Sequence, residues 1–202
     1  ACMQNKEAPR TNRERTEATR GALLAAARNL FVERGYGDTS TPDICAAAGI
    51  TRGALYHHFT DKRDLFRQVL VAEAQAVAAQ IEAASPGNLS PREMLLAGSA
   101  AYLQAMGMPG RTRLLLVEGP AALGLAEVQA LDAAYVAATL EEGLAAAGAD
   151  LGGVPRGWST RLLSAAFDRA ALEVDGGADA GQALAAMHWL LERVLGPAPT
   201  SS

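Results

Sequence analysis

The chain has 202 residues, of which 50% are apolar, so it can bury a sizeable core without disulfides or metals. No apolar run approaches the roughly 20 residues of a membrane span, and the N-terminal stretch ACMQNKEAPRTNRER is polar where a secretory signal would be apolar. We therefore expect a soluble, cytoplasmic protein with no membrane partner. Cys2 and Cys45 are too few for a disulfide framework and do not form a Cys-x-x-Cys pair.

The net charge of -4 is unevenly distributed along the chain. Residues 1–67 hold 11 Lys and Arg against 8 Asp and Glu, a balance of +3, while residues 68–202 hold 7 against 14, a balance of -7. A basic N-terminal third joined to an acidic remainder predicts an anion-binding head on a body that has another task.

The first helix is expected over residues 15–34. Its apolar residues recur at the spacing of one helical face, and Gly35 ends the pattern; the stripe consists of Leu23, Ala27, Leu30 and Phe31. Alanine and leucine dominate the whole chain, and the alternation typical of strands is absent. The predicted fold class is therefore all-α.

Two short helices and a long one are expected next. Thr41 is the expected N-cap of the second helix, with Pro42 in its first position and Gly49 as its left-handed C-cap. Thr51 is expected to cap the third helix, which runs to about His58, and the fourth helix begins at residue 60 or 61 and runs to about residue 84.

Segments rich in glycine and proline divide the rest of the chain. They are GMPG, GP, GADLGGVPRG and DGGAD, and SPGNLSP precedes them. The helices expected between these separators cover 91–106, 111–118, 121–147, 158–174 and 179–195.

The second and third helices, joined by AAGIT, form a predicted helix-turn-helix, whose second helix enters the major groove of DNA. At 100° per residue, Leu55 and Phe59 share one face of that helix, and Gly53 and His57 share the opposite face. We expect the first face to be buried against the preceding helix and turn, at Ile44, Ala48 and Ile50.

The opposite face has the chemistry that close approach to DNA requires. Gly53 and Ala54 add no bulk, whereas Arg52, Tyr56 and His57 offer hydrogen bonds to phosphate oxygens and base edges.

The adjacent histidines His57 and His58 have three other interpretations. A metal site needs two imidazoles on one face, but neighbouring residues diverge by about 100°. Catalysis needs a nucleophile or an orienting carboxylate, and the local sequence places none there. Simple solvent exposure remains the alternative to DNA contact. We therefore expect neither an enzyme nor a metal or cofactor site.

The segment TRGALLAAARNLFVERGYGDTSTPDICAAAGITRGALYHHFTDKRDLF resembles the N-terminal domain of the TetR family of bacterial transcriptional regulators. The resemblance covers about 50 contiguous residues. It implies two groups of DNA contacts. The phosphate contacts are Thr41, Thr51, Tyr56, His58 and Lys62, and the residues that face the base edges are Arg52, Gly53, Ala54 and His57.

Two positions depart from the family pattern. Cys45 stands where the family commonly has alanine; it is either a redox sensor or, as free cysteines usually are, a small buried packing residue. Only Lys62 and Arg63 supply positive charge at the start of the fourth helix. A cation at a helix start is unfavourable for the helix dipole, which a phosphate partner or plain surface tolerance would explain.

The apolar positions of the last two expected helices indicate that the protein forms a homodimer through residues 158–195. A single helix-turn-helix reads few base pairs, so such proteins pair two heads on a pseudo-palindromic operator in double-stranded DNA. Two apolar helices from each subunit can close a four-helix bundle, and the family resemblance implies the same arrangement. The alternative is that these helices pack only within one subunit. The apolar positions are Trp158, Leu162, Leu163, Ala166, Phe167, Ala170, Val174, Leu184, Met187, Leu191, Val194 and Leu195.

The resemblance also implies an effector pocket between the central helices, whose occupation moves the fourth helix. An apolar and aromatic lining would suit a small organic molecule. The candidate lining residues are Tyr102, Met106, Met108, Leu115, Glu118, Tyr135 and Trp158. The alternative is that these residues only fill the core, and that Glu118 points outward at a helix end.

These expectations define four regions: a flexible arm at 1–14, a DNA-binding domain at 15–67, a helical ligand-binding and dimerisation domain at 68–195, and a disordered tail at 196–202. The predicted function is a DNA-binding transcriptional regulator, a repressor released from its operator by a small organic effector. The alternative is an architectural or cell-division DNA-binding factor on the same fold, and a closed or absent pocket would favour it.

Overall fold

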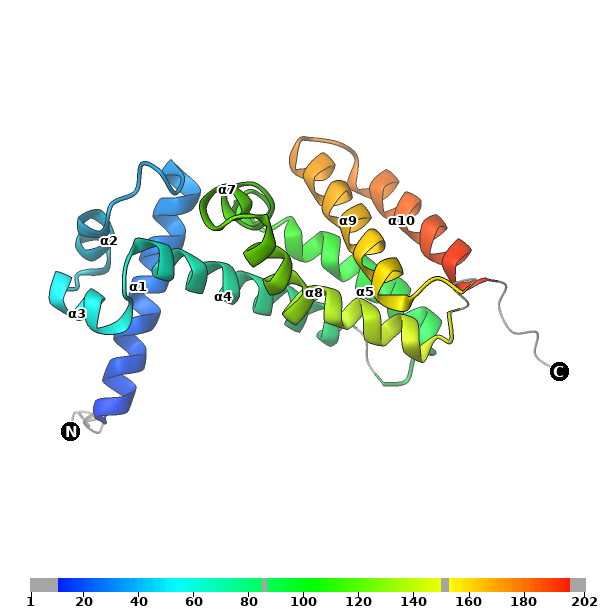
Figure 1. Cartoon of the computed structure of the whole chain (residues 1–202), viewed down its shortest axis with the longest axis horizontal. Coiled ribbons are helices and arrows are strands. Elements are labelled where there is room, and N and C mark those ends of the chain that lie inside the picture. The colour runs from blue at the N-terminus through cyan, green and yellow to red at the C-terminus, as the bar shows by residue number, and fades with distance from the viewer. Residues whose placement is uncertain (1–10, 85–86, 150–152, 197–202) are drawn as a thin grey trace, which may run out of the picture. The chain divides into compact units, whose positions relative to one another are not determined.

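The computed structural model describes residues 11–84, 87–149 and 153–196 (Figure 1). Their regular elements are all helices, which confirms the expected all-α class. The chain divides into two compact units, Ala1–Val69 and Leu70–Ser202. The proposed N-terminal arm and C-terminal tail fall mainly on residues 1–10 and 197–202, which lie outside the described residues. None of the helices described is long and apolar enough to cross a membrane.

The first unit consists of α1 (Asn12–Arg34), α2 (Thr41–Ala48), α3 (Arg52–His58) and the start of α4 (Lys62–Ala83). Helix α1 begins three residues before the expected position 15, because Thr11 and Glu14 form a reciprocal capping box. The predicted apolar stripe is confirmed, since all four of its residues are buried; they are Leu23, Ala27, Leu30 and Phe31.

The helix-turn-helix has the expected caps with one correction. The N-cap of α2 is Ser40, not Thr41, because the Ser40 hydroxyl accepts from the Asp43 amide and the Asp43 carboxylate bonds the Ser40 amide in return. Gly49 ends α2 in the left-handed region at φ 66°, and the Thr51 hydroxyl accepts from the Ala54 amide to start α3. These two caps agree with the sequence-based prediction.

The second unit contains the rest of α4 and the elements that follow it. Two expected boundaries are wrong. Residues 111–123 are continuously helical, as one α turn, a π-helix and a second short α-helix, so the expected separator GP at 119–120 lies inside this stretch. Gly124 at φ 88° then separates α7 from α8 inside the expected 121–147 helix. The elements are α5 (Pro91–Met106), α6 (Arg111–Arg113), η1 (Leu114–Glu118), α7 (Gly119–Leu123), α8 (Leu125–Ala146), α9 (Arg156–Asp175) and α10 (Ala180–Leu195).

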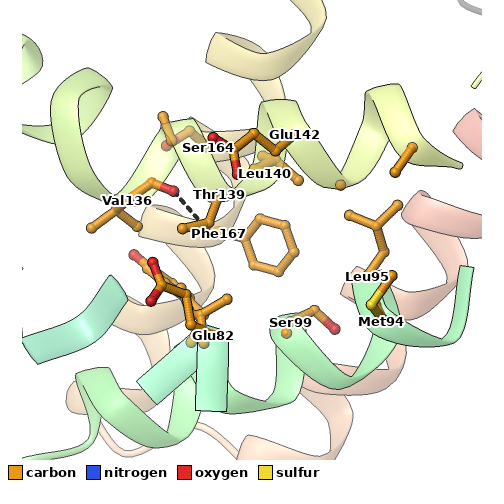
Figure 2. Close-up of a pocket in the computed structure, with 16 residues that line it drawn as sticks. Glu82, Met94, Leu95, Ser99, Val136, Thr139, Leu140, Glu142, Ser164 and Phe167 are labelled. Carbon is orange, nitrogen blue, oxygen red and sulfur yellow. Dashed lines mark hydrogen bonds between the residues drawn. The ribbon is translucent and has the colours of Figure 1, made fainter. Parts of the chain in front are cut away.

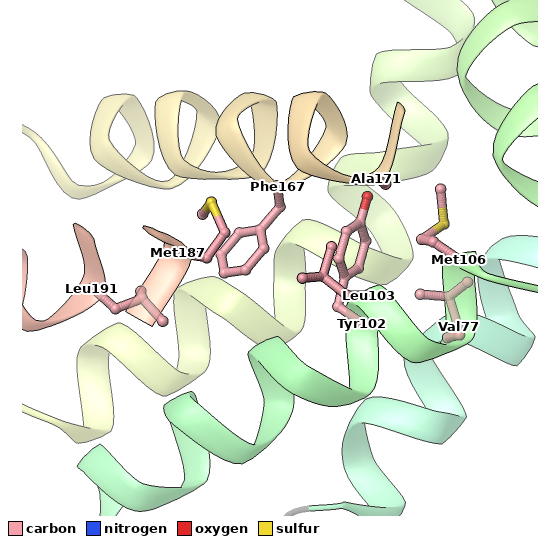
Figure 3. Close-up of a cluster of buried hydrophobic side chains, with 9 residues drawn as sticks. Val77, Tyr102, Leu103, Met106, Phe167, Ala171, Met187 and Leu191 are labelled. Carbon is pink, nitrogen blue, oxygen red and sulfur yellow. The ribbon is translucent and has the colours of Figure 1, made fainter. Parts of the chain in front are cut away.

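The core of the second unit joins side chains from α4, α5, α9 and α10, as Figure 3 shows. The rings of Tyr102 and Phe167 meet edge to face with centroids 5.5 Å apart. Met187 and Leu191 of α10 pack in the same cluster. Part of the apolar surface predicted for the dimer interface is therefore buried within one subunit.

A buried ion pair holds the turn after α5. The guanidinium of Arg111 donates to Glu73 of α4 at 2.7 Å and to the Ala105 carbonyl at 2.7 Å, and its third contact is the Met108 sulfur at 3.0 Å. Arg111 and Glu73 are only 2% and 6% exposed. The pair thus ties α4 to the beginning of α6, directly before the π-helix.

Candidate DNA-binding and effector sites

Helix α3 is amphipathic in the predicted sense. Leu55 and Phe59 are buried, at 0% and 2% exposure, whereas Arg52, Gly53 and His57 are exposed. The Leu55 amide donates a hydrogen bond to the Thr51 carbonyl at the start of the helix, and the Phe59 amide donates one to the Leu55 carbonyl at its end. Its outer face therefore carries a guanidinium, an imidazole and a position without a side chain, all open to solvent.

Residues from α2 and α3 meet at one edge of this face. The hydroxyls of Thr41 and Tyr56 lie 3.4 Å apart and share a hydrogen bond. The Arg52 guanidinium lies over the Tyr56 ring, 5.5 Å from its centroid. The hydrogen bond with Thr41, followed by that with Arg52, lowers the pKa of the Tyr56 phenol below its usual value. Three residues predicted to bind DNA thus form one connected group.

A shallow depression at the N-terminus of α2 brings together the predicted phosphate contacts Thr41, Tyr56 and Lys62. Helix N-termini present free amide groups and a positive dipole end to anions. The predicted contact Thr51 lies apart from this depression, at the start of α3, and His58 is half-buried at its end. The depression is lined by Gly37, Asp38, Thr39, Ser40, Thr41, Pro42, Tyr56 and Lys62.

Lys62 has a structural role that the sequence did not reveal. Its Nζ donates to the Tyr36 carbonyl at 2.9 Å and to the Gly37 carbonyl at 3.5 Å, and it lies 4.3 Å from the centroid of the Tyr36 ring. An ammonium has three donor hydrogens, so these two bonds still leave one donor for a phosphate. Carbonyl capping after α1 is a further reason for a cation at the start of α4.

The two histidines differ in exposure, since His57 is exposed and His58 is half-buried. Their ring centroids lie 5.4 Å apart with the planes at 76°, and His58 turns toward Phe59 while His57 faces solvent. Among the described residues, no group of three His, Cys, Asp or Glu is placed to hold a metal ion. Cys45 is a free thiol with 8% exposure, so it is buried as the packing interpretation requires.

The second unit contains two cavities of ligand size. The first, of about 420 Å³, lies among α4, α5, α8 and α9. In Figure 2 the ring of Phe167 projects between α5, which carries Met94 and Ser99, and α8, which carries Thr139. The hydroxyls of Ser99 and Thr139 bond to backbone carbonyls of their own helices, so this cavity is mainly apolar.

The second cavity, of about 410 Å³, lies between α4, α5, the η1–α7 segment, α8 and α9. Tyr102 and Val136 line both cavities. The π-helix η1 contributes Leu115 and Leu116, and π-helical segments often occur at functional sites. The other lining residues are Leu70, Ala74, Met106, Pro120, Leu125, Val128, Gln129, Leu131, Asp132, Ala165, Asp168, Arg169 and Leu172.

The candidate effector residues are placed differently from one another. Tyr102, Met106 and Leu115 line the second cavity. Glu118, Tyr135 and Trp158 line neither of the two cavities; Glu118 accepts from the Arg113 guanidinium at 2.8 Å, and Trp158 is 58% exposed beside Arg161. Met108 is 42% exposed and contacts Arg111.

Sequence reasoning missed the polar group between the cavities. The Tyr102 hydroxyl donates to Asp168 at 2.7 Å, and the Ser164 hydroxyl donates to Asp132 at 3.0 Å. Burial, reinforced by the nearby Asp132 charge, raises the pKa of Asp168 to about 6 against the opposing bond from Tyr102, and burial also raises the pKa of Asp132. Single acids inside apolar helices were the available signal, in LDAAY and FDRAA.

Comparison with known proteins gives the class to which this architecture belongs. The profile described as "Bacterial regulatory proteins, tetR family" matches residues 23–69, and "Tetracyclin repressor-like, C-terminal domain" matches residues 92–197, more than half of the chain. The chain therefore belongs to the TetR family of bacterial transcriptional regulators, whose members are regulators and not enzymes.

Individual relatives agree mainly over the N-terminal region. The HTH-type transcriptional repressor BepR of Brucella suis is 46% identical over 61 residues, and the regulator AcrR of Shigella flexneri is 43% identical over 60 residues. These matches cover 30% of this chain and only 29% and 28% of the relatives.

A solved TetR-family regulator from Pectobacterium atrosepticum is similar over nearly the whole chain. It is 31% identical with a TM-score of 0.66, and the match covers 92% of this chain and 96% of that one. A TetR-family structure from Shewanella has a TM-score of 0.71 at 21% identity, covering 86% and 95% of the two chains, and so supports the fold alone.

Proposed function

We propose that this protein is a homodimeric repressor that binds a pseudo-palindromic operator through α2 and α3 and leaves it when a small organic effector enters the second unit. The exposed outer face of α3, held by buried Leu55 and Phe59, is the observation that carries the DNA-binding part. A short helix anchored on one side and polar on the other is the form that enters a major groove.

Within the motif we assign positioning and base reading to different residues. The residues proposed to contact DNA phosphates surround the N-terminus of α2 and the two ends of α3. The residues proposed to read the bases lie on the outer face of α3. The phosphate contacts are Thr41, Thr51, Tyr56, His58 and Lys62; the base-facing residues are Arg52, Gly53, Ala54 and His57.

Exposed tryptophans support dimerisation through α9 and α10. Trp158, Leu162 and Trp189 are 58%, 65% and 60% exposed, although large apolar side chains are usually buried. A second copy of the same two helices would cover them in a four-helix bundle. The protein should therefore be a dimer at micromolar concentration by light scattering. The Leu162→Glu variant should be a monomer. The control variant Val117→Glu, at an exposed apolar site on η1, should remain a dimer.

The two cavities favour a ligand-responsive regulator over the architectural alternative, which predicts a closed interior. Helix α4 begins at Lys62, beside the proposed phosphate site, and its later residues Leu70, Ala74 and Ile81 line the cavities. A ligand that displaces α4 would therefore act on the helix that carries a DNA contact.

Sequencing the genomic DNA that the purified protein retains tests this function. We expect a small set of two-fold symmetric sites, each bound by the wild type and lost by Gly53→Leu. Indiscriminate retention of genomic DNA would support the architectural factor instead. The genes beside the recovered sites then supply candidate effectors, and one of these should release the operator.

A further inference from the structure

The second cavity has a mostly apolar lining, and its charged residues lie together on α8 and α9. Its walls are mostly aliphatic, from α4, α5 and the η1–α7 segment. Asp132 of α8 and Asp168 of α9 both line it, and each is half-buried. An apolar ligand alone would need neither carboxylate, so the pair points to a specific ligand charge.

Neither carboxylate has a cationic partner among the residues the structure describes. Asp168 accepts from Tyr102 and Asp132 accepts from Ser164, both neutral hydroxyls. The neighbouring cation, Arg169, pairs instead with Glu173 one turn along α9. Both carboxylates are half-buried, and a half-buried charge without a counter-ion is unfavourable. A cationic occupant would supply the missing positive group.

The titratable groups around Asp168 come from three helices. They are Tyr102 of α5, Asp132 of α8 and Arg169 of α9 itself, and the cavity lining contains no others. The raised pKa of Asp168, about 6, has burial as its main cause and the Asp132 charge as a supporting one. The carboxylate is nevertheless ionised above neutral pH, where it attracts a cation.

The ligands at this place do not suit a simple metal ion. Calcium prefers six to eight oxygen ligands and magnesium an octahedral set, but the other polar side chains near the two aspartates are few, and no group of three His, Cys, Asp or Glu among the described residues is placed to hold a metal. A volume of about 410 Å³ also fits an organic molecule of moderate size.

We propose that the second cavity binds an amphipathic organic monocation, with its positive group beside Asp132 and Asp168 and its apolar part along Met106, Leu115 and Leu116. The proposal rests on the ligand-responsive function above, since it names the chemical class of the effector. The Tyr102 ring, which lines the same chamber, adds a π face that also attracts a cation.

Sets of matched compounds test the charge preference directly. Each set shares one apolar skeleton, phenylbutyl, naphthylmethyl or octyl, and differs only in a trimethylammonium, hydroxyl or carboxylate end. Thermal unfolding of the full chain at pH 8 should show an increase in Tm with the ammonium compounds, and isothermal titration should give at least tenfold tighter binding than for the alcohols and no binding of the carboxylates.

Two variants locate the cation, and a third is their control. Asp168→Asn and Asp132→Asn should each weaken ammonium binding tenfold or more while leaving alcohol binding unchanged, because the amides keep the hydrogen bonds to Tyr102 and Ser164. Asp175→Asn removes the same charge from the exposed end of α9, outside both cavities, and should bind like the wild type. Circular dichroism confirms that each variant is folded.

The possible outcomes separate this proposal from the proposed function. If no ammonium compound raises the Tm, or if the carboxylates bind better, the cation assignment is wrong even if another molecule releases the operator. If the ammonium compounds bind through Asp168 but the operator complex survives them, the cation site stands and the effector role of the cavity fails.

Discussion

The proposed DNA-contacting surface of the first unit and the second cavity of the other unit are built in opposite ways. The surface draws on residues 41–62, a continuous piece of chain whose polar groups are mostly exposed. The cavity draws on side chains from Leu70 to Leu172, and its two carboxylates are half-buried. A site made of neighbouring residues on one helix can be inferred from periodicity, whereas a site made of distant segments cannot.

The largest expected effect tests the local site. Gly53→Leu should reduce specific operator binding by about a thousandfold or more, to the level of nonspecific binding, because a branched side chain would hold α3 away from the groove. A Cβ at Gly53 meets nothing within 4 Å, so the fold should be unaffected. Fluorescence anisotropy on operator DNA measures the loss. Gly21→Leu, at another open helical glycine, is the control, and normal binding by folded Gly53→Leu would remove α3 from the groove.

The next effect tests how far the interior of the second unit depends on paired charges. Arg111→Met should lower the free energy of unfolding by about 3–5 kcal/mol, because Glu73 keeps its buried charge but loses the guanidinium. The double variant Arg111→Met/Glu73→Leu should recover much of the loss, since no charge remains buried there. Urea unfolding at pH 7 measures both. A single variant as stable as the wild type would show that this pair is not a structural tie.

Arg52 sharpens the difference between reading and positioning. If its guanidinium reaches a guanine edge, Arg52→Ala should cost about 1–3 kcal/mol per half-site on the operator and relax the preference at one base pair. Loss of the contact with the Tyr56 ring contributes little at this exposed position. Titrations on operator and scrambled duplexes decide between the roles. Equal losses on both duplexes would identify Arg52 as a phosphate contact.

At Asp168 we expect one substitution to raise the stability of the fold and to weaken the proposed ligand binding. The pKa of Asp168 is raised from 3.8 to about 6 in the folded chain, so the fold holds the proton more tightly than the unfolded chain does. The stabilisation that comes from this tighter proton binding is therefore fully present below pH 4, and it is lost as the pH rises through 6 and the folded Asp168 ionises. Asp168→Asn does not titrate and should be about 2–3 kcal/mol more stable than the wild type at pH 8, with the gap closing toward pH 4.

Denaturant unfolding across this pH range measures the gap, and Asp175→Asn should show no comparable pH dependence. A variant that gains stability while it loses ammonium binding would mark Asp168 as a residue that is unfavourable for the fold. A gap that is independent of pH would contradict the assignment of the raised pKa to this residue.

The smallest effect concerns Lys62, which has both a structural and a proposed DNA contact. Lys62→Ala should weaken binding to operator and random DNA alike, and flatten the slope of log K against log salt by about 0.9 for each lost phosphate contact. Loss of the bonds to the Tyr36 and Gly37 carbonyls should also lower the free energy of unfolding by about 1 kcal/mol. An unchanged salt slope with lowered stability would leave Lys62 only its structural role.

The amino-acid sequence alone determined the helix-turn-helix, because caps such as Thr51 and Gly49 and the buried face of Leu55 and Phe59 depend on interactions a few residues apart. It also predicted the helical content of the second unit. Only the tertiary structure decided how the segment after α5 divides, through the buried Arg111–Glu73 pair, the π-helix and Gly124. The same holds for the cavity, since Tyr102 and Asp168 are 66 residues apart in the chain. No local pattern encodes which distant helices share one interior, because burial and the resulting pKa of Asp168 arise only when those helices pack together.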